Sequence, residues 1–472
     1  MKRHRNLDIA GPTRSNGSIR GFGLQQANCP GLVRSTGMDM LFKGGLLLPC
    51  DDTNLTLRAD LRVRNGVIAE IGPGLEALDC TPVDASRSWI LPGFVQTHIH
   101  LCQTLFRGMA EDRALLEWLG ERIWPLEAAH DAESAGLSAR LGIVEMISGG
   151  TTSFMDMGSL RHTDAIFEAC EAFGVRASVG RALMDRENPA GLHASAEANL
   201  RGACDEADRW HNKGRLRYAF APRFVPSCSD GLLRECVREA RSRGAMLHTH
   251  ASENLDELDL VRQLTGKENI EYLQDVGLLG PDVGLAHCIH LSEREVSLLA
   301  ETGTRVLHCP SSNMKLASGI ASVPSLLEKG VHISMGADGA PCNNRLDAFS
   351  EMRHAGLLQS LKVGAGSLPA HIILRMATLS GAEALGIADQ VGSLTVGKKA
   401  DLVLLDADAP ALLSAANPVD LVVYSAGPEH VKSVYIEGER IVHNGEVRGW
   451  DAAESAEKVR EASRAVADRA FA

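Results

Sequence analysis

Five side chains that can bind a metal ion follow short apolar stretches of this sequence: His98, His100, His250, His287 and Asp338. His98 and His100 are two residues apart, so on an extended strand both imidazoles point to the same face. One such residue after an apolar strand is usually structural. Five of them in similar places are hard to explain in that way, and together they indicate a metal site.

The ligand types narrow the choice of metal. Imidazole and carboxylate groups suit Zn²⁺ or Fe²⁺, whereas Mg²⁺ and Ca²⁺ prefer sites made mostly of oxygen. A catalytic site of this kind keeps one position open for water, and the metal lowers the pKa of that water to about 7. The chemistry to expect is therefore attack by an activated water molecule.

The apolar stretches that carry these residues alternate with helix-like segments between residues 92 and 391. Eight strands are predicted, at Gly93–His98, Thr151–Met157, Val175–Leu183, Leu216–Phe224, Ala245–Ala251, Val283–Cys288, Arg305–Cys309 and Ile333–Ala337. Such alternation is typical of an α/β fold with a parallel sheet. Eight units predict a (β/α)8 TIM barrel of the metal-dependent hydrolase type, whose active site lies at the C-terminal ends of the strands.

The fourth predicted strand bears on the number of metal ions. Barrels of this kind that hold two metals commonly bridge them with a carboxylated lysine on that strand. The stretch Tyr218–Phe224 contains no lysine. We therefore expect one metal ion rather than two.

The two ends of the chain differ from the middle. Residues 38–91 and 392–450 contain short alternating stretches broken by turns such as Asn65-Gly66, which is a strong hairpin signal. We expect these segments to form one small β-sandwich domain built from both termini. Residues 1–37, which are basic and rich in glycine and serine, predict a flexible extension, and residues 451–472 predict a closing helix.

Composition excludes several classes of partner. The net charge of −12 argues against binding to nucleic acid, which normally needs a basic patch. No apolar run reaches the length of about 18 residues that a membrane span requires. Eleven cysteines without a CxxC pair fit a reduced, cytoplasmic protein.

The stretch Pro92–His100, together with His250-Ala251-Ser252-Glu253 and Asp338, resembles the amidohydrolase superfamily, in its branch of aminohydrolases acting on nitrogen heterocycles. The resemblance covers about residues 40–450. It implies one divalent metal, Zn²⁺ or alternatively Fe²⁺, bound by His98, His100, His250 and Asp338. It also implies that Glu253 shuttles a proton and that His287 positions the hydroxide or the substrate.

The reaction implied is hydrolytic deamination. A metal-bound hydroxide attacks the ring carbon that bears the amino group, and Asp338 passes the water proton towards the leaving nitrogen. Glu253 protonates the adjacent ring nitrogen, while His287 stabilises the developing oxygen charge. The implied partners are a small nitrogen heterocycle and water, and a homo-oligomer is the expected assembly.

Within the branch, the chain is most similar to 5′-methylthioadenosine/S-adenosylhomocysteine deaminases and their 5′-deoxyadenosine relatives. The stretches that carry this likeness are Leu116–Leu119, Ile123–Glu127, His287–Leu291, His308–Ala317 and Gly336–Ala340. By this likeness the substrate is an adenosine-type nucleoside. Glu127 would bind the ribose hydroxyls, and Arg181 would form one arm of a carboxylate clamp.

Two residues depart from that pattern. Arg223 stands where the adenosine-type enzymes carry a histidine, and Gln103 follows His100 by three residues; both resemble guanine deaminase. Arginine and glutamine are donors that could hold a ring carbonyl, as on guanine or a pterin such as isoxanthopterin. The s-triazine amino- and chlorohydrolases are similar overall, but they place asparagine where this chain has Gly339.

Two further classes of function fit parts of the same pattern. A cyclic amidase on the same barrel is disfavoured because the fourth strand lacks the bridging lysine. A catalytically inactive barrel that serves as a scaffold is disfavoured because the ligand set is intact.

Overall fold

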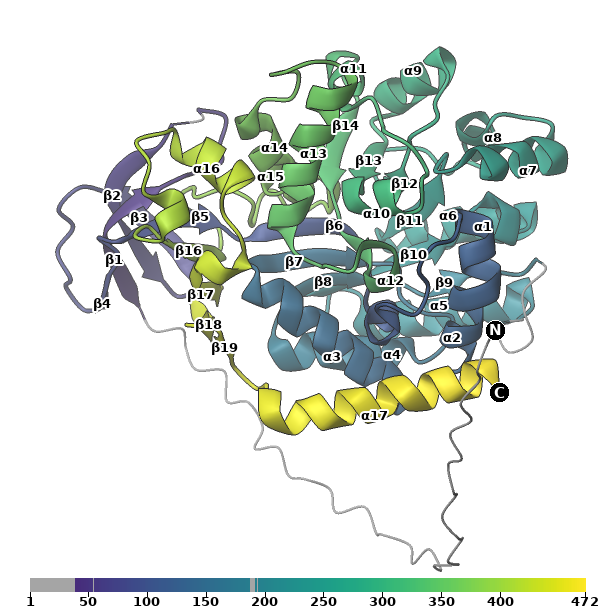
Figure 1. Cartoon of the computed structure of the whole chain (residues 1–472), viewed down its shortest axis with the longest axis horizontal. Coiled ribbons are helices and arrows are strands. Elements are labelled where there is room, and N and C mark those ends of the chain that lie inside the picture. The colour runs from purple at the N-terminus through teal and green to yellow at the C-terminus, as the bar shows by residue number, and fades with distance from the viewer. Residues whose placement is uncertain (1–38, 54, 187–191, 193) are drawn as a thin grey trace, which may run out of the picture. The chain divides into compact units, whose positions relative to one another are not determined.

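The computed structural model describes residues 39–53, 55–186, 192 and 194–472. The predicted extension over residues 1–37 lies outside these residues. Within them, two sheets organise the chain, and both appear in Figure 1.

The larger sheet contains the strands of the predicted barrel. Its pairing order is β14-β13-β12-β11-β10-β8-β7-β6-β15, with β9 paired to β10, and neighbouring strands run parallel. The strands are β6 (Phe94–His100), β7 (Thr151–Asp156), β8 (Arg176–Val179), β9 (Ala182–Leu183), β10 (Leu216–Pro222), β11 (Met246–Ala251), β12 (Val283–His287), β13 (Arg305–His308), β14 (His332–Met335) and β15 (Asp338–Gly339). Each of the eight predicted stretches overlaps a strand; β8 and β9 share the third stretch, and β15 follows directly after the eighth.

The sheet closes on itself where the eighth stretch meets the first. Asp338 of β15 pairs with Ile99 of β6, and the Thr97 hydroxyl donates to the Met335 carbonyl at 3.1 Å. Gly336 makes this approach possible, because a Cβ atom there would lie 2.5 Å from the His98 carbonyl oxygen. The structure therefore confirms the predicted closed barrel.

Helices surround the barrel and begin and end at local sequence signals. The main ones are α3 (Ala132–Ser148), α4 (Thr163–Phe173), α5 (Ala196–Trp210), α6 (Asp230–Arg243), α7 (Leu255–Thr265), α8 (Asn269–Asp275), α9 (Glu293–Thr302), α11 (Val323–Glu328) and α13 (Ala348–Lys362). Helix α9 is typical: Ser292 and Glu295 form a capping box at its start, and Gly303, with φ of +68°, ends it. Because helices cover the outer face and side chains fill the interior, all residues of β6, β7 and β12 are buried.

The second sheet combines strands from both ends of the chain. They are β1 (Met40–Leu47), β2 (Leu57–Arg64), β3 (Val67–Gly72), β4 (Thr81–Asp84), β5 (Ser88–Pro92), β16 (Leu402–Asp406), β17 (Val431–Ile436), β18 (Glu439–His443) and β19 (Glu446–Val447). Phe42 of β1 and Tyr435 of β17 pack edge to face within a shared core, with centroids 5.1 Å apart. Strand β5 runs almost directly into β6 and so fixes where the barrel begins.

The segment after β6 builds one wall of the barrel mouth. It comprises η1 (Leu101–Phe106), α1 (Leu115–Trp118), the π-helical turn η2 (Leu119–Ile123) and α2 (Trp124–Ala128). The C-terminal helix α17 (Ala452–Phe471) packs against α2 and α3, as Figure 1 shows. Among the described residues, no helix combines the length and apolarity that crossing a membrane requires.

Candidate metal centre and active site

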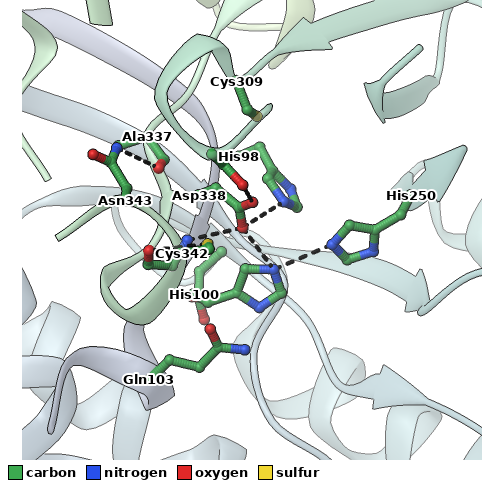
Figure 2. Close-up of polar contacts among 12 residues, drawn as sticks. His98, His100, Gln103, His250, Cys309, Ala337, Asp338, Cys342 and Asn343 are labelled. Carbon is green, nitrogen blue, oxygen red and sulfur yellow. Dashed lines mark hydrogen bonds and ion pairs between the residues drawn. The ribbon is translucent and has the colours of Figure 1, made fainter. Parts of the chain in front are cut away.

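The four predicted ligands converge at the C-terminal mouth of the barrel (Figure 2). One ligand atom from each of His98, His100, His250 and Asp338 lies within 4.8 Å of the others. Asp338 Oδ1 is 3.3 Å from Nε2 of both His98 and His100, and His100 Nε2 is 3.2 Å from His250 Nε2. Three imidazoles and one carboxylate at this spacing form the donor set that Zn²⁺ prefers.

Hydrogen bonds outside the cluster leave the inward-facing nitrogens free to bind a metal. His250 Nδ1 lies 2.7 Å from the Arg223 carbonyl, which can only accept, so Nδ1 carries the proton and Nε2 keeps its lone pair. His98 Nδ1 lies 2.7 Å from His248 Nε2. Among the described residues, His98 Nε2 is buried without a hydrogen-bond partner. A metal ion at the centre would satisfy that atom, so the residues present fit such an ion.

The electrostatics of the cluster also favour a cation. Burial lowers the pKa of His98, and lowers those of His100 and His250 still further, so all three remain neutral ligands. Burial acts to raise the pKa of Asp338, but the imidazoles packed against it, first of all His98 and then His100 and His287, outweigh burial and hold that pKa well below its ordinary value. Asp338 is therefore an anionic ligand among neutral ones.

Glu253 and His287 form a second pair beside the ligands. His287 Nε2 lies 3.4 Å from Glu253 Oε2 and 3.9 Å from Asp338 Oδ2. Burial raises the pKa of Glu253 to about 7. Burial acts to lower the pKa of His287, but the charges of Glu253 and Asp338 outweigh it and raise that pKa. A carboxyl group that titrates near neutral pH suits general acid–base catalysis.

Neighbouring side chains hold this pair in place. His287 Nδ1 donates to Asn313 Oδ1 at 2.8 Å, and the Ser318 hydroxyl donates to Glu253 Oε1 at 3.1 Å. Glu257 accepts from the Glu253 backbone N–H at 2.7 Å, which ties the start of α7 to the end of β11. Hydrogen bonds within the protein thus orient Glu253 and His287 before any substrate binds.

The backbone turns sharply where three strands end. Ser252, His287 and Asp338 all have positive φ, of +54°, +74° and +63° respectively. Such conformations are uncommon outside glycine and cluster at functional sites. Here they lie at the strand ends that present the ligands and the Glu253–His287 pair.

A cavity opens in front of the ligands. Its polar side contains His100, Gln103, Arg223, His250, Glu253, Glu257, His287 and Asp338. Its apolar side contains Leu115, Trp118, Leu119, Phe224 and Leu316. One apolar wall faces a few polar groups, as is usual for small-molecule sites.

Three predicted substrate-binding residues form a buried network beside this cavity. Arg223 donates from Nη1 to Glu127 Oε2 at 2.6 Å and from Nη2 to Glu127 Oε1 at 3.1 Å. Gln103 Nε2 also donates to Glu127 Oε1, at 2.9 Å. Gln103 Oε1 is buried and has no hydrogen-bond partner among the described residues. The Gln103 side-chain amide therefore already donates within the protein, and its carbonyl oxygen is left without a partner among the described residues.

Arg181, predicted to form one arm of a carboxylate clamp, is not among the described residues that line the cavity. Its guanidinium group forms an ion pair with Glu206 of α5 and donates to the Leu160 carbonyl at 2.6 Å. Glu206 is buried, so this pair binds the loop after β8 to α5. The guanidinium group of Arg181 is thus already bound to a carboxylate within the protein, that of Glu206.

Several residues of the site were missed by sequence reasoning. His248 contacts His98, Ser312 donates to Asp338 Oδ2 at 2.6 Å, and Asn313 orients His287. Position 248 carried a signal, because it precedes His250 by two residues and so shares its face of the strand. Ser312 and Asn313 lie in a stretch that supported the family resemblance, but nothing in their spacing indicated these partners.

Comparison with known proteins gives a consistent picture. Residues 89–441 match the amidohydrolase family. The 5′-deoxyadenosine deaminase of Methanosarcina acetivorans is 37% identical over 438 residues, covering 92% of this chain and 100% of the relative. The 5-methylthioadenosine/S-adenosylhomocysteine deaminase of Syntrophobacter fumaroxidans is also 37% identical over 438 residues, covering 92% and 99%. A zinc-bound adenosine deaminase structure from Xanthomonas campestris is 31% identical, with a TM-score of 0.86 over 91% of this chain and 99% of that one.

Proposed function

Because this chain belongs to the amidohydrolase family, we propose that it is a metal-dependent deaminase of an adenosine-type nucleoside. It replaces the amino group of the purine ring with oxygen and releases ammonia. The observation that carries the proposal is the position of Glu253, a buried carboxyl group whose pKa lies near 7, directly beside a cluster of four metal ligands. The names of the relatives support the same reaction.

We propose Zn²⁺ as the metal, held by His98, His100, His250 and Asp338. When bound, a divalent metal supplies Lewis acidity that lowers the pKa of a water molecule to about 7. The three imidazoles with one carboxylate support this choice, as does the zinc in the related adenosine deaminase structure.

The protein's own groups divide the proton transfers. Glu253, protonated near neutral pH, donates to the ring nitrogen next to the reacting carbon and makes that carbon electrophilic. Asp338 accepts the proton of the attacking water at its carboxylate and returns it to the departing nitrogen. His287, whose pKa the neighbouring carboxylates raise, stabilises the negative charge that develops on oxygen.

The apolar wall supports a choice among adenosine-type substrates. Leu115, Trp118 and Phe224 would face the ribose 5′ substituent if the purine ring lies at the metal ligands. A 5′-deoxy or 5′-methylthio group matches that surface. The charged amino acid end of S-adenosylhomocysteine would find no free cation, because Arg223 is paired with Glu127 and is the only arginine or lysine among the described cavity residues. We therefore propose 5′-deoxyadenosine and methylthioadenosine as the preferred substrates.

A second candidate is deamination of an oxo-heterocycle such as guanine or isoxanthopterin. The network of Gln103, Glu127 and Arg223 favours it, because Glu127 is already bound by two partners and is less available to ribose hydroxyls. Arg223 could donate to a ring carbonyl, and Gln103 Oε1 could accept from a neighbouring ring N–H.

Ammonia release from the zinc-loaded protein distinguishes these proposals. The panel should contain 5′-deoxyadenosine, methylthioadenosine, S-adenosylhomocysteine, guanine, isoxanthopterin and melamine. The first two should have the highest kcat/KM, and S-adenosylhomocysteine should be slower. Activity confined to guanine or isoxanthopterin would establish the second candidate, and no ammonia from any compound would refute deamination of this class of ring.

We further propose that the protein is a cytoplasmic homo-oligomer. Every cysteine in the described residues is a free thiol, which supports a reducing compartment. Sedimentation velocity tests the assembly, and a single species at the monomer mass would contradict it.

A further inference from the structure

Glu351 is a buried acid on α13, outside the cavity and away from the metal ligands. Its side chain binds two loops that follow different strands of the barrel. Oε2 accepts from the Ser311 backbone N–H at 3.2 Å, and Oε1 accepts from the Ser311 hydroxyl. Oε1 also accepts from Asn343 Nδ2 at 2.8 Å. Ser311 lies at the start of α10 (Pro310–Lys315), and Asn343 ends α12 (Ala340–Asn343).

The first of these loops carries groups that contact the candidate active site. Directly after Ser311, the Ser312 hydroxyl donates to Asp338 Oδ2 at 2.6 Å, and Asn313 Oδ1 accepts from His287 Nδ1 at 2.8 Å. A shift of Ser311 would therefore move the hydrogen-bond partners of both the ligand Asp338 and His287.

The second loop reaches the same ligand through its backbone. Asn343 uses one Nδ2 hydrogen to bind Glu351 and the other to bind the Ala337 carbonyl at 2.7 Å, a contact drawn in Figure 2. Ala337 immediately precedes Asp338, whose backbone has a positive φ of +63°. An uncommon backbone conformation persists only where the surroundings hold it, and Asn343 is part of that support.

We propose that Glu351 is a positioning residue, which places Asp338 and His287 by binding the loops after β13 and β15 to each other. It acts through Ser311 and Asn343 and touches neither substrate nor metal. The kinetic part of this inference rests on the proposed deaminase function, whereas its effect on metal binding does not. His354, one turn further along α13, adds a second contact to Ser311 Oγ at 2.7 Å.

A purely structural acid elsewhere in the barrel provides the matched control. Glu295 of α9 is equally buried and also accepts from three donors: the Ser292 N–H at 2.8 Å, the Ser292 hydroxyl at 2.9 Å and the Ile270 N–H at 3.0 Å. These bonds join α8 to α9 and reach none of the site residues. Both acids thus accept two bonds from one serine and one from a second segment.

The experiment compares Glu351→Ala with Glu295→Ala in the zinc-loaded full chain. Zinc affinity is measured by competition with a chromogenic chelator, and kcat and KM are measured with the best substrate of the panel. Groups that orient metal ligands typically change metal affinity or activity by about 10–100-fold. Glu351→Ala should weaken zinc binding and lower kcat by amounts in that range, with a smaller change in KM. Glu295→Ala should lower the midpoint of urea unfolding but leave zinc affinity and kcat near those of the wild type.

Two further variants keep the test decisive if Glu351→Ala does not fold. Asn343→Ala removes only the side-chain hydrogen bonds of the second loop, and it should also weaken zinc binding. Glu351→Gln keeps the size and one acceptor oxygen and should recover part of the lost affinity. The proposal would be overturned if the folded Glu351 variants had the same zinc affinity and kcat as Glu295→Ala. It would also be overturned if Asn343→Ala bound zinc as tightly as the wild type does. A wild-type protein that releases no ammonia would refute the proposed function, while zinc affinity would still decide the role of Glu351.

Discussion

Arg223 and Glu127 form a bidentate ion pair beside the metal ligands, with side chains only 3% and 2% exposed. The same Arg223 supplies the carbonyl that fixes the proton on His250 Nδ1. Arg223 therefore connects two parts of the site. Its side chain binds Glu127, and its backbone carbonyl orients the metal ligand His250.

Removing the Glu127 carboxylate should destabilise the protein strongly, because Arg223 would remain buried without its partner. Breaking a buried pair in this way typically costs about 3–5 kcal/mol. Urea unfolding of Glu127→Gln measures the effect. The control is Glu197→Gln, which breaks the exposed pair with Arg201 and should cost less than about 1 kcal/mol. Equal effects of the two substitutions would show that the buried pair is not the source of the stability.

Arg181→Ala should not affect substrate choice. Arg181 is bound to Glu206 and lies outside the cavity lining, so kcat/KM for S-adenosylhomocysteine relative to 5′-deoxyadenosine should stay the same. The free energy of unfolding should fall, because Glu206 would be left buried and unpaired. A loss of activity confined to S-adenosylhomocysteine would instead support the carboxylate-clamp role.

His248→Ala should weaken metal binding by about 10–100-fold, the usual effect of removing a group that orients a metal-binding histidine. His248 Nε2 lies 2.7 Å from His98 Nδ1, and without it the His98 ring loses its only hydrogen-bond contact in the described chain. Chelator competition measures the change. His332→Ala, which removes a histidine paired with Glu383 away from the ligands, is the control. The same zinc affinity in both variants would argue against this role of His248.

Asp156 should make the stability of the protein depend on pH. Burial raises the pKa of this carboxyl group from 3.8 to about 7, although it accepts from the Leu101 N–H at 2.7 Å. The folded state therefore holds the Asp156 proton more tightly than the unfolded state does. The contribution of Asp156 to stability is fully present below its unfolded pKa and is lost as pH rises through the folded value.

Asp156→Asn removes this titration while keeping an acceptor for the Leu101 N–H. Between about pH 5 and pH 8, the free energy of unfolding of the wild type should fall relative to that of the variant. Urea unfolding at both pH values gives the comparison, and a difference that does not change with pH would contradict the raised pKa.

The barrel could be predicted because its strands are short apolar stretches that end in polar residues, a pattern that local sequence displays. The candidate metal-binding residues could be proposed for the same reason, whereas the choice of four ligands and the role of Glu253 came from the resemblance to the amidohydrolase superfamily. The sequence could not indicate that Arg181 meets Glu206, because that contact depends on how α5 packs against the barrel. Nor could it indicate the positive φ of His287 and Asp338, since neither is a glycine and tertiary contacts impose the conformation.

The orientation of a side-chain amide lies beyond sequence reasoning as well. Gln103 could equally have offered its amide N–H groups to a substrate. Only the position of Glu127 determines that Nε2 donates within the protein and that Oε1 is left without a partner among the described residues.

The central claim is that Glu253 transfers the proton that makes the ring carbon reactive, next to a metal that it does not bind. Ammonia release by zinc-loaded Glu253→Gln, measured together with its zinc content, tests this most directly. Loss of a proton-transfer group typically lowers the rate by about 10²–10⁴, so turnover should fall at least that far while zinc stays at the wild-type level. Near-normal turnover with zinc bound would contradict the account.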